Sequence, residues 1–160
     1  MDSYRGVVIT VSDRVSQGQS EDRSGPTAVE ILEELGFRCS LVVTPDGVGE
    51  VEGAIRLALQ SDPAVVVTTG GTGMSPRDLT PEGTLRVVER LAPGLAEAMR
   101  SATFGTNPHG MLSRGVCGMA GRTLILNLPG SVSGVKESLS VVRLALRHAV
   151  ELLRSAETEH

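Results

Sequence analysis

The sequence predicts an α/β fold, a three-layer sandwich in which helices cover both faces of a mostly parallel sheet with a small β-hairpin at its edge. Two observations support this. Short apolar runs rich in β-branched residues alternate with segments of helical periodicity along the chain, and glycine, proline and aspartate separate them. With 160 residues, 40% of them hydrophobic, the chain can bury one core. We expect a single domain over residues 1–155 and a frayed tail over residues 156–160.

The first half of the chain predicts three strands and two helices. Residues 6–12 are a β-branched run, and a polar stretch follows them. Residues 27–35 repeat apolar positions at helical spacing and stop at Gly36, a typical helix end. A strand over residues 41–43 ends at the turn sequence Pro45-Asp46-Gly47. A helix over residues 51–59 and a strand over residues 64–68 follow.

The second half predicts three helices and a hairpin. Thr80 and Pro81 suit a capping residue and the first position of a helix over residues 81–91. Pro93-Gly94 should break that helix before a short helix over residues 95–102, and a loop over residues 106–110 follows. Ala120-Gly121 joins two strands, expected over residues 112–119 and 122–128. The last helix is expected over residues 133–155.

Composition excludes several functions. A net charge of −4 and only three aromatic residues argue against nucleic-acid binding. No apolar run approaches membrane-spanning length, so no membrane association is expected. Cys39 and Cys117 lie far apart in apolar stretches and are expected to be buried thiols. Together with the absence of a signal-peptide pattern, they predict a cytoplasmic protein. The three histidines are scattered, so no zinc site is expected.

The segment after the third predicted strand is the strongest functional signal. Gly70, Gly71 and Gly73 allow backbone N–H groups to approach an anion, and Thr72 adds a hydroxyl. A tight strand-to-helix turn would explain the glycines alone. Arg77-Asp78, directly after them, places a cation and a carboxylate beside the loop, which favours a phosphate site that uses a divalent cation.

Asp46 follows the second strand and is therefore expected at the same edge of the sheet as Asp78. Two convergent carboxylates together with substrate phosphates suit Mg²⁺. The alternative for Asp46 is a plain turn residue. Asp13 follows the first strand, and for it we favour a structural role, accepting backbone N–H bonds across neighbouring loops.

Gly130-Ser131 forms a second strand-to-helix turn, whose free N–H groups could hold another phosphate. Helix capping by Ser131 or Ser133 explains the same residues nearly as well. Ser113 and Arg114 offer a hydroxyl and a cation but say little by themselves. The chain lacks the P-loop pattern, the dinucleotide-binding glycine pattern and the nucleophile elbow.

Together, these motifs resemble the molybdopterin-binding domain family of molybdenum cofactor biosynthesis, and most closely its molybdopterin adenylyltransferases. The resembling pieces cover nearly the whole chain in order. They are Ser12-Asp13-Arg14, Asp22 to Pro26, Pro45-Asp46, Thr69 to Glu82, Pro93-Gly94, Met111 to Arg114 and Leu124 to Gly130.

The resemblance implies a reaction and a set of roles. The family joins molybdopterin to ATP with Mg²⁺, giving adenylylated molybdopterin and pyrophosphate. By this resemblance Asp46 and Asp78 are the catalytic, metal-holding carboxylates. The implied binding residues are Gly70, Gly71, Thr72 and Gly73 for nucleotide phosphates, Ser113 near the pterin-side phosphate, and Gly130 and Ser131 in the pterin pocket.

Two positions depart from the family's pattern. Val132 stands where a second proline often follows the Leu-Pro-Gly motif, and Gly47 stands where an acidic or amide residue often follows Pro-Asp. A MoaB-type protein without robust catalysis and a non-catalytic scaffold remain alternatives. The resemblance also implies a homo-oligomer, a trimer or, for a MoaB-type protein, a hexamer, with a molybdate-insertion protein as a further possible partner.

Overall fold

The computed structural model describes residues 3–155, and in this part of the chain six strands form one sheet in the order β2-β1-β3-β6-β5-β4. The predicted tail over residues 156–160 lies outside the described residues. Strands β2, β1, β3 and β6 are parallel to one another, and β5 and β4, at the other edge, are each antiparallel to the strand before them in this order. The strands are β1 (Tyr4–Val11), β2 (Phe37–Thr44), β3 (Val65–Thr69), β4 (Arg90–Leu91), β5 (Cys117–Ala120) and β6 (Thr123–Leu128).

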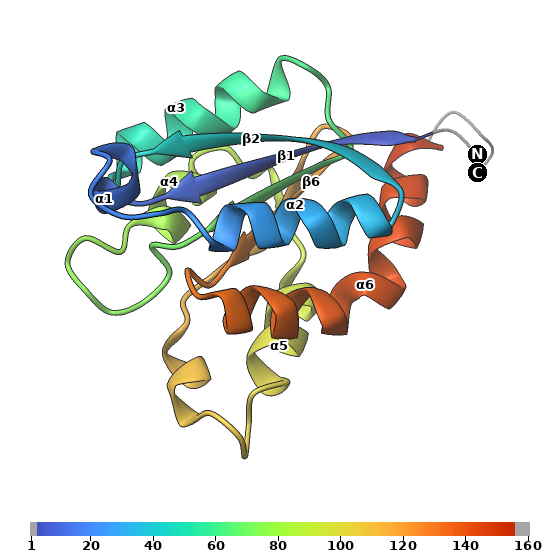
Figure 1. Ribbon diagram of the computed structural model, residues 1–160. Coiled ribbons are helices and arrows are strands. Elements are labelled where there is room, and N and C mark those ends of the chain that lie inside the picture. The colour runs from blue at the N-terminus through green and yellow to red at the C-terminus, as the bar shows by residue number, and fades with distance from the viewer. Residues whose placement is uncertain (1–2, 156–160) are drawn as a thin grey trace.

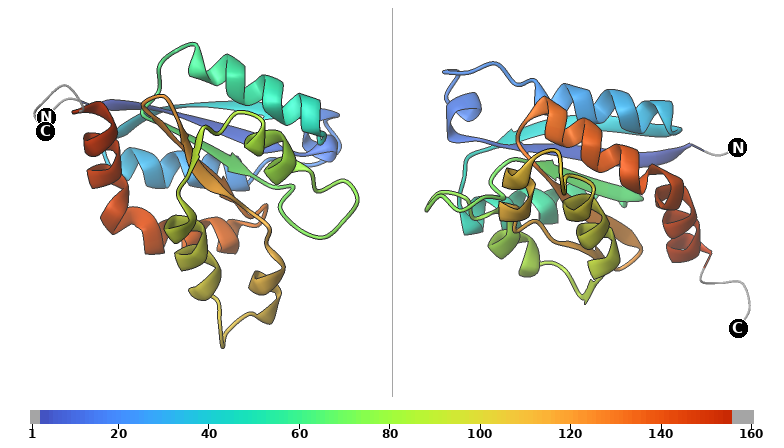
Figure 2. Two further views of the ribbon diagram at one scale, coloured as in Figure 1. Left: turned by 180° about the vertical axis from the view of Figure 1, so that it is seen from behind. Right: turned by 90° about the horizontal axis from the view of Figure 1, so that it is seen from below.

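Helices cover both faces of the sheet, which confirms the predicted sandwich (Figure 1, Figure 2). The helices are α1 (Asp13–Ser16), α2 (Ser24–Glu34), α3 (Val48–Leu59), α4 (Thr80–Leu85), α5 (Pro93–Ser101), η1 (Pro108–Leu112) and α6 (Val132–Arg154). Two separate cores follow from the alternation of side chains along the strands. Val8, Val65 and Val67 pack against α2, α5 and α6, whereas Val7 and Val66 pack against α3.

The helix predicted over residues 81–91 is wrong in its second half. It ends at Leu85, and Arg90 and Leu91 pair with Met119 and Gly118 to form the edge strand β4. A Cβ atom at position 118 would collide with the Val88 side chain and lie 2.7 Å from the Arg90 carbonyl oxygen. This close approach, available only to glycine, lets tertiary pairing override the helical periodicity.

Other boundaries also differ from the prediction. Asp13–Ser16 is a short helix in the expected polar stretch, capped by Ser12 Oγ, which accepts from the Val15 N–H at 3.2 Å. Pro93 begins α5, because proline lacks an N–H and suits the first turn. The expected loop over residues 106–110 mostly belongs to the short helix η1. The hairpin β5–β6 is confirmed, but its first strand begins only at Cys117.

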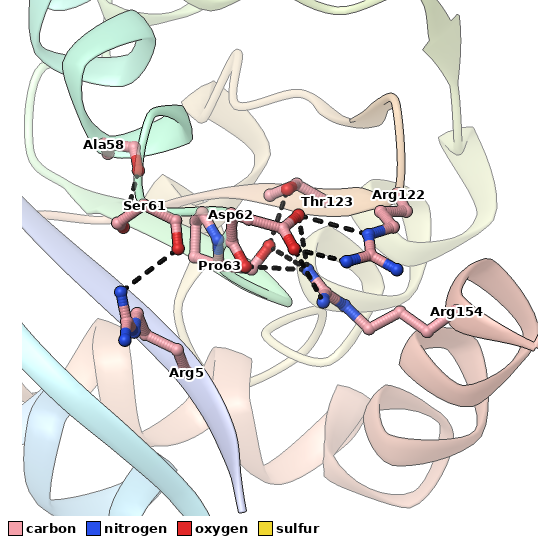
Figure 3. A network of polar contacts seen from close by, with 8 residues as sticks. All are labelled: Arg5, Ala58, Ser61, Asp62, Pro63, Arg122, Thr123 and Arg154. Atoms are coloured by element: carbon pink, nitrogen blue, oxygen red, sulfur yellow. Dashed lines mark hydrogen bonds and ion pairs between the residues drawn. The ribbon is translucent and has the colours of Figure 1, made fainter.

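At the amino ends of the central strands, an ionic network ties the end of α6 to the start of β3 (Figure 3). The Asp62 carboxylate accepts from Arg122 and from Arg154 Nη2, and Arg154 also donates to the Pro63 carbonyl oxygen at 2.7 Å. The hydrogen bond from Arg122 is the main reason why the pKa of Asp62 is lowered. Since this end of the sheet is opposite the predicted site, we assign the network a structural role.

The two cysteines are free thiols, as predicted, although Cys39 is only half-buried. Burial raises the pKa of Cys39 to about 11 and that of Cys117 to about 12, so neither forms a reactive thiolate at neutral pH. Within residues 3–155, no helix is both long and apolar enough to cross a membrane.

Candidate functional site

The carboxyl ends of β1, β3 and β6 bring the predicted loops together. Strands β1 and β2 point to the left in Figure 1, where α1 and the light-green glycine-rich loop lie. The Gly70 N–H donates to the Leu128 carbonyl oxygen at 3.1 Å, and Thr80 Oγ1 donates to the Gly70 carbonyl oxygen at 2.9 Å. A Cβ atom on Gly130 would lie 3.2 Å from the Gly70 Cα atom, so these two backbones touch.

Gly70 and Gly71 both occupy the left-handed region, with φ of 94° and 68°. A side chain at Gly70 would lie 2.5 Å from the Val11 carbonyl oxygen, and one at Gly71 would collide with Thr80 Oγ1. Thr80 is therefore not the predicted capping residue. It is the first residue of α4, and its hydroxyl fixes the glycine-rich loop instead.

Asp13 and Asp46 form a reciprocal pair across neighbouring loops. The Asp46 N–H donates to Asp13 Oδ1, and the Asp13 N–H donates to Asp46 Oδ2, both at 3.0 Å. The structural role predicted for Asp13 is confirmed. While Oδ2 accepts from Asp13, Asp46 Oδ1 faces the glycine-rich loop, 3.4 Å from where a Gly71 Cβ atom would be.

The Asp78 carboxylate lies beside Gly73, two residues after the glycine that Asp46 faces. Its Oδ2 atom accepts from the Ser75 N–H at 2.9 Å and would lie 2.9 Å from a Cβ atom on Gly73. The two carboxylates therefore flank one run of glycines. Their charges also interact, because Asp78 is among the groups that raise the pKa of Asp46.

The pKa of Asp46 is raised, first by burial. The hydrogen bond from Asp13 opposes this, the Asp13 and Asp78 charges raise the pKa further, and Arg77 lowers it. Within residues 3–155, no group of three or more His, Cys, Asp or Glu side chains is arranged to hold a metal ion. A cation at Asp46 and Asp78 would therefore need further oxygen ligands from a substrate.

The raised pKa predicts that Asp46→Asn stabilises the protein at neutral pH. A folded-state pKa above the unfolded value means that the charged carboxylate destabilises the fold above both values, and the cost disappears below the unfolded pKa. Asparagine keeps the acceptor for the Asp13 N–H. Solvent screens this half-buried group, so we expect a gain of only about 1–2 °C in Tm at pH 7.

Thermal unfolding of both proteins between pH 3 and pH 8 measures this effect. The difference in Tm should shrink as the pH falls toward the ordinary aspartate range of about 4. A Tm difference that grows on acidification would contradict a raised pKa at Asp46.

Two cavities flank the glycine-rich loop. The first cavity, of about 230 Å³, lies between α5, η1 and the start of α6. The second, of about 530 Å³, lies between residues 20–24, the end of β1 and the start of α6. Thr72, Gly73 and Ser113 line the first cavity, Gly70 and Gly130 line the second, and Ser131 lines both.

Three further residues lie at the two cavities. Ser131 caps α6, accepting from the Gly134 N–H at 3.0 Å, as one of the two alternatives predicted. Val132, a departure from the family's pattern, begins α6 and lines the second cavity. His109 is exposed and lines the first cavity.

Two arginines were not recognised from the sequence as parts of the site. Arg114 Nε donates to the Gly73 carbonyl oxygen at 2.8 Å, and its Nη2 donates to the Asp78 carbonyl oxygen at 2.5 Å. Arg100 Nη1 donates to the carbonyl oxygens of Ser113 and Gly115, at 3.3 and 2.7 Å. The position of Arg114 in the Met111 to Arg114 motif was the only signal available.

A glycine-rich loop with two carboxylates lies at the carboxyl edge of a mostly parallel sheet covered on both faces, and α/β domains of this class bind their ligands at that edge. The family described as a probable molybdopterin binding domain matches residues 7–148, and the chain belongs to it, a family of molybdenum cofactor biosynthesis.

Individual relatives agree with this assignment. The chain is 39% identical to "Gephyrin" from Dictyostelium discoideum over 92% of its own length but only 22% of that protein. It is 36% identical to "Molybdopterin adenylyltransferase" from Helicobacter pylori strain J99, covering 91% of this chain and 85% of that one. The solved structure of the molybdopterin biosynthesis enzyme MoaB from Thermus thermophilus superposes with a TM-score of 0.89. That protein is 40% identical, and the match covers 95% of this chain and 97% of the other.

Proposed function

We propose that this protein is a molybdopterin adenylyltransferase, which transfers AMP from ATP to the phosphate of molybdopterin and releases pyrophosphate. The observation that carries the proposal is the placement of Asp46 and Asp78 against one glycine run that lies between two cavities. The likeness to the Helicobacter pylori adenylyltransferase over most of both chains supports it.

The two cavities suit a reaction that joins two ligands. The first combines apolar side chains, Met99 and Leu112, with polar groups such as Asn127 and Ser138, a mixture typical of small-molecule sites. We assign the pterin to this cavity, which Ser131 lines. Gly130, which the resemblance also places in the pterin pocket, lines the second cavity instead. The phosphates of ATP would lie along the glycine-rich loop, where Thr72 and backbone N–H groups other than that of Gly70, which donates to Leu128, meet the anion.

The chain's residues would act by positioning and charge compensation. An oxygen of the molybdopterin phosphate forms a bond to the α-phosphorus of ATP while the bond to the β-phosphate oxygen breaks and pyrophosphate leaves. The loop holds the triphosphate in line with that attack, and its backbone dipoles stabilise the charge that develops. No covalent protein intermediate is required.

The donor set fits Mg²⁺, because Asp46 and Asp78 supply hard carboxylate oxygens. Burial is the main cause of the raised pKa of Asp46 and the Asp78 charge adds to it, and a cation between the two carboxylates would offset both effects. When bound, the ion would neutralise negative charge on the phosphates.

The direct test is an assay of the purified protein with molybdopterin, ATP and Mg²⁺. We expect adenylylated molybdopterin and pyrophosphate to form in equal amounts, and omission of any one component should stop both. Tight molybdopterin binding without product would overturn the enzymatic proposal. It would favour the second candidate, a MoaB-type protein without robust catalysis. The likeness to the Thermus thermophilus MoaB structure supports the MoaB type but not the lack of catalysis.

We also propose that the protein forms a homo-oligomer, a trimer or, if it is of the MoaB type, a hexamer. Exposed apolar side chains on the edge strand β2, Leu41, Val42 and Val43, are available for burial between copies. A protein that inserts molybdate would be the partner receiving the product.

A further inference from the structure

We infer that Arg114 is a positioning residue, which holds the glycine-rich loop and Asp78 in the geometry that transfer requires. This inference rests on the proposed adenylyl transfer and adds a residue to its machinery. Arg114 lies in the segment that precedes β5 and reaches across to a loop about 40 residues earlier in the sequence.

The guanidinium group makes three bonds to three different acceptors. Its Nε donates to the Gly73 carbonyl oxygen at 2.8 Å, and Nη2 donates to the Asp78 carbonyl oxygen at 2.5 Å. Its Nη1 pairs with Glu82 Oε1 at 2.5 Å. In addition, the Arg114 N–H donates to the Thr72 carbonyl oxygen at 2.7 Å. Arg114 therefore forms hydrogen bonds to the loop near both ends of residues 72–78.

Glu82 anchors this arrangement to a helix. It lies in the first turn of α4, and α4 is fixed to the sheet because Asn127 Nδ2 donates to Thr84 Oγ1 at 3.0 Å. The Glu82 Oε2 atom is buried and has no hydrogen-bond partner within the described residues. Arg114 is the cation that pairs with this partly exposed carboxylate.

Only arginine can span these acceptors. Its planar fork carries five N–H donors, whereas lysine presents all its donors on one nitrogen. Lysine would still compensate the charge of Glu82 but would release at least one carbonyl of the loop. The Asp78 carboxylate, whose direction follows from the backbone at residues 73–78, would then lose its fixed orientation.

Arg114→Lys is therefore the informative variant. Because a displacement of about 1 Å can cost about 10²-fold in rate, we expect kcat to fall between about 10- and 100-fold. KM for molybdopterin should change less than about threefold, since the first cavity keeps its lining, and more Mg²⁺ should be needed for half-maximal rate. A merely structural role would not lower kcat while leaving KM for molybdopterin nearly unchanged.

Arg56→Lys is the matched control. Arg56 also donates to a carboxylate and a carbonyl, Glu52 at 3.4 Å and Arg86 at 2.9 Å, but on the surface of α3. Its kcat should equal that of the unmodified protein. Equal kcat for Arg114→Lys and Arg56→Lys would overturn the inference.

A second readout does not depend on turnover. The Asp78 N–H donates to the Ser75 carbonyl oxygen and the Thr80 N–H to that of Gly71. Hydrogen exchange at these two amides should be at least about tenfold faster in Arg114→Lys and unchanged in Arg56→Lys. Unchanged exchange in Arg114→Lys would refute the inference even if the unmodified protein transferred no AMP. Absence of AMP transfer by the unmodified protein would contradict the proposed function but would leave this inference to the exchange measurement.

Discussion

Asp78→Asn is expected to abolish AMP transfer while leaving the fold intact. Asparagine keeps an oxygen that accepts from the Ser75 N–H but removes the negative charge beside the glycine-rich loop. Loss of one preorganised electrostatic group in an active site costs on the order of 10²–10³-fold in kcat. We expect at least this loss in the assay for adenylylated molybdopterin, with a change in Tm of less than about 2 °C.

Glu34→Gln, on the exposed end of α2, is the control for loss of one surface charge and should retain full activity. Asp78→Asn should also lower the pKa of Asp46, measured by NMR titration of its carboxyl group, because the Asp78 charge raises it. Asp46→Asn should impair transfer strongly as well. Full activity in both aspartate variants would show that the metal assignment is wrong.

Gly70→Ala is expected to cause the largest loss of stability. Gly70 is buried with a φ of 94°, and an added Cβ atom would lie 2.5 Å from the backbone oxygen of Val11. Left-handed backbone costs about 1–2 kcal/mol and overpacking about 1–3 kcal/mol, so the free energy of unfolding should fall by about 2–5 kcal/mol. Urea denaturation measures it.

Gly18→Ala separates the two causes. Gly18 has a similar φ of 74°, but no atom lies within 4 Å of its added Cβ, so only the backbone cost of about 1–2 kcal/mol applies. If the free energy of unfolding fell equally in both variants, the close contact between Gly70 and β1 would not contribute to the loss of stability.

The parts of the fold that the sequence predicts well depend on local patterns. The β-branched run before Gly70 could only be a buried strand, and the loops at the carboxyl ends of parallel strands had to share one edge. From this follow the meeting of Asp13 with Asp46 and the approach of Asp46 to the glycine-rich loop.

The parts that were missed depend on partners distant in sequence. Arg90 and Leu91 become a strand only because Gly118 admits them beside β5. Thr80 has the sequence of a helix cap, yet its hydroxyl bonds to Gly70. The motif around Arg114 does not show what its side chain binds, since the three acceptors of the guanidinium group lie 32 to 41 residues away. Periodicity and turn propensity contain no information about such contacts.

The central claim is that Asp46 and Asp78 hold one divalent cation against a triphosphate. Crystals grown with Mn²⁺ and an ATP analogue carrying a methylene group between the α- and β-phosphorus test it through the anomalous signal of the metal. We predict one Mn²⁺ ion bound at roughly 2.1 Å by an oxygen of each carboxylate and by a phosphate oxygen. A triphosphate bound on the glycine-rich loop with the metal contacting neither aspartate, or only one, would contradict the claim.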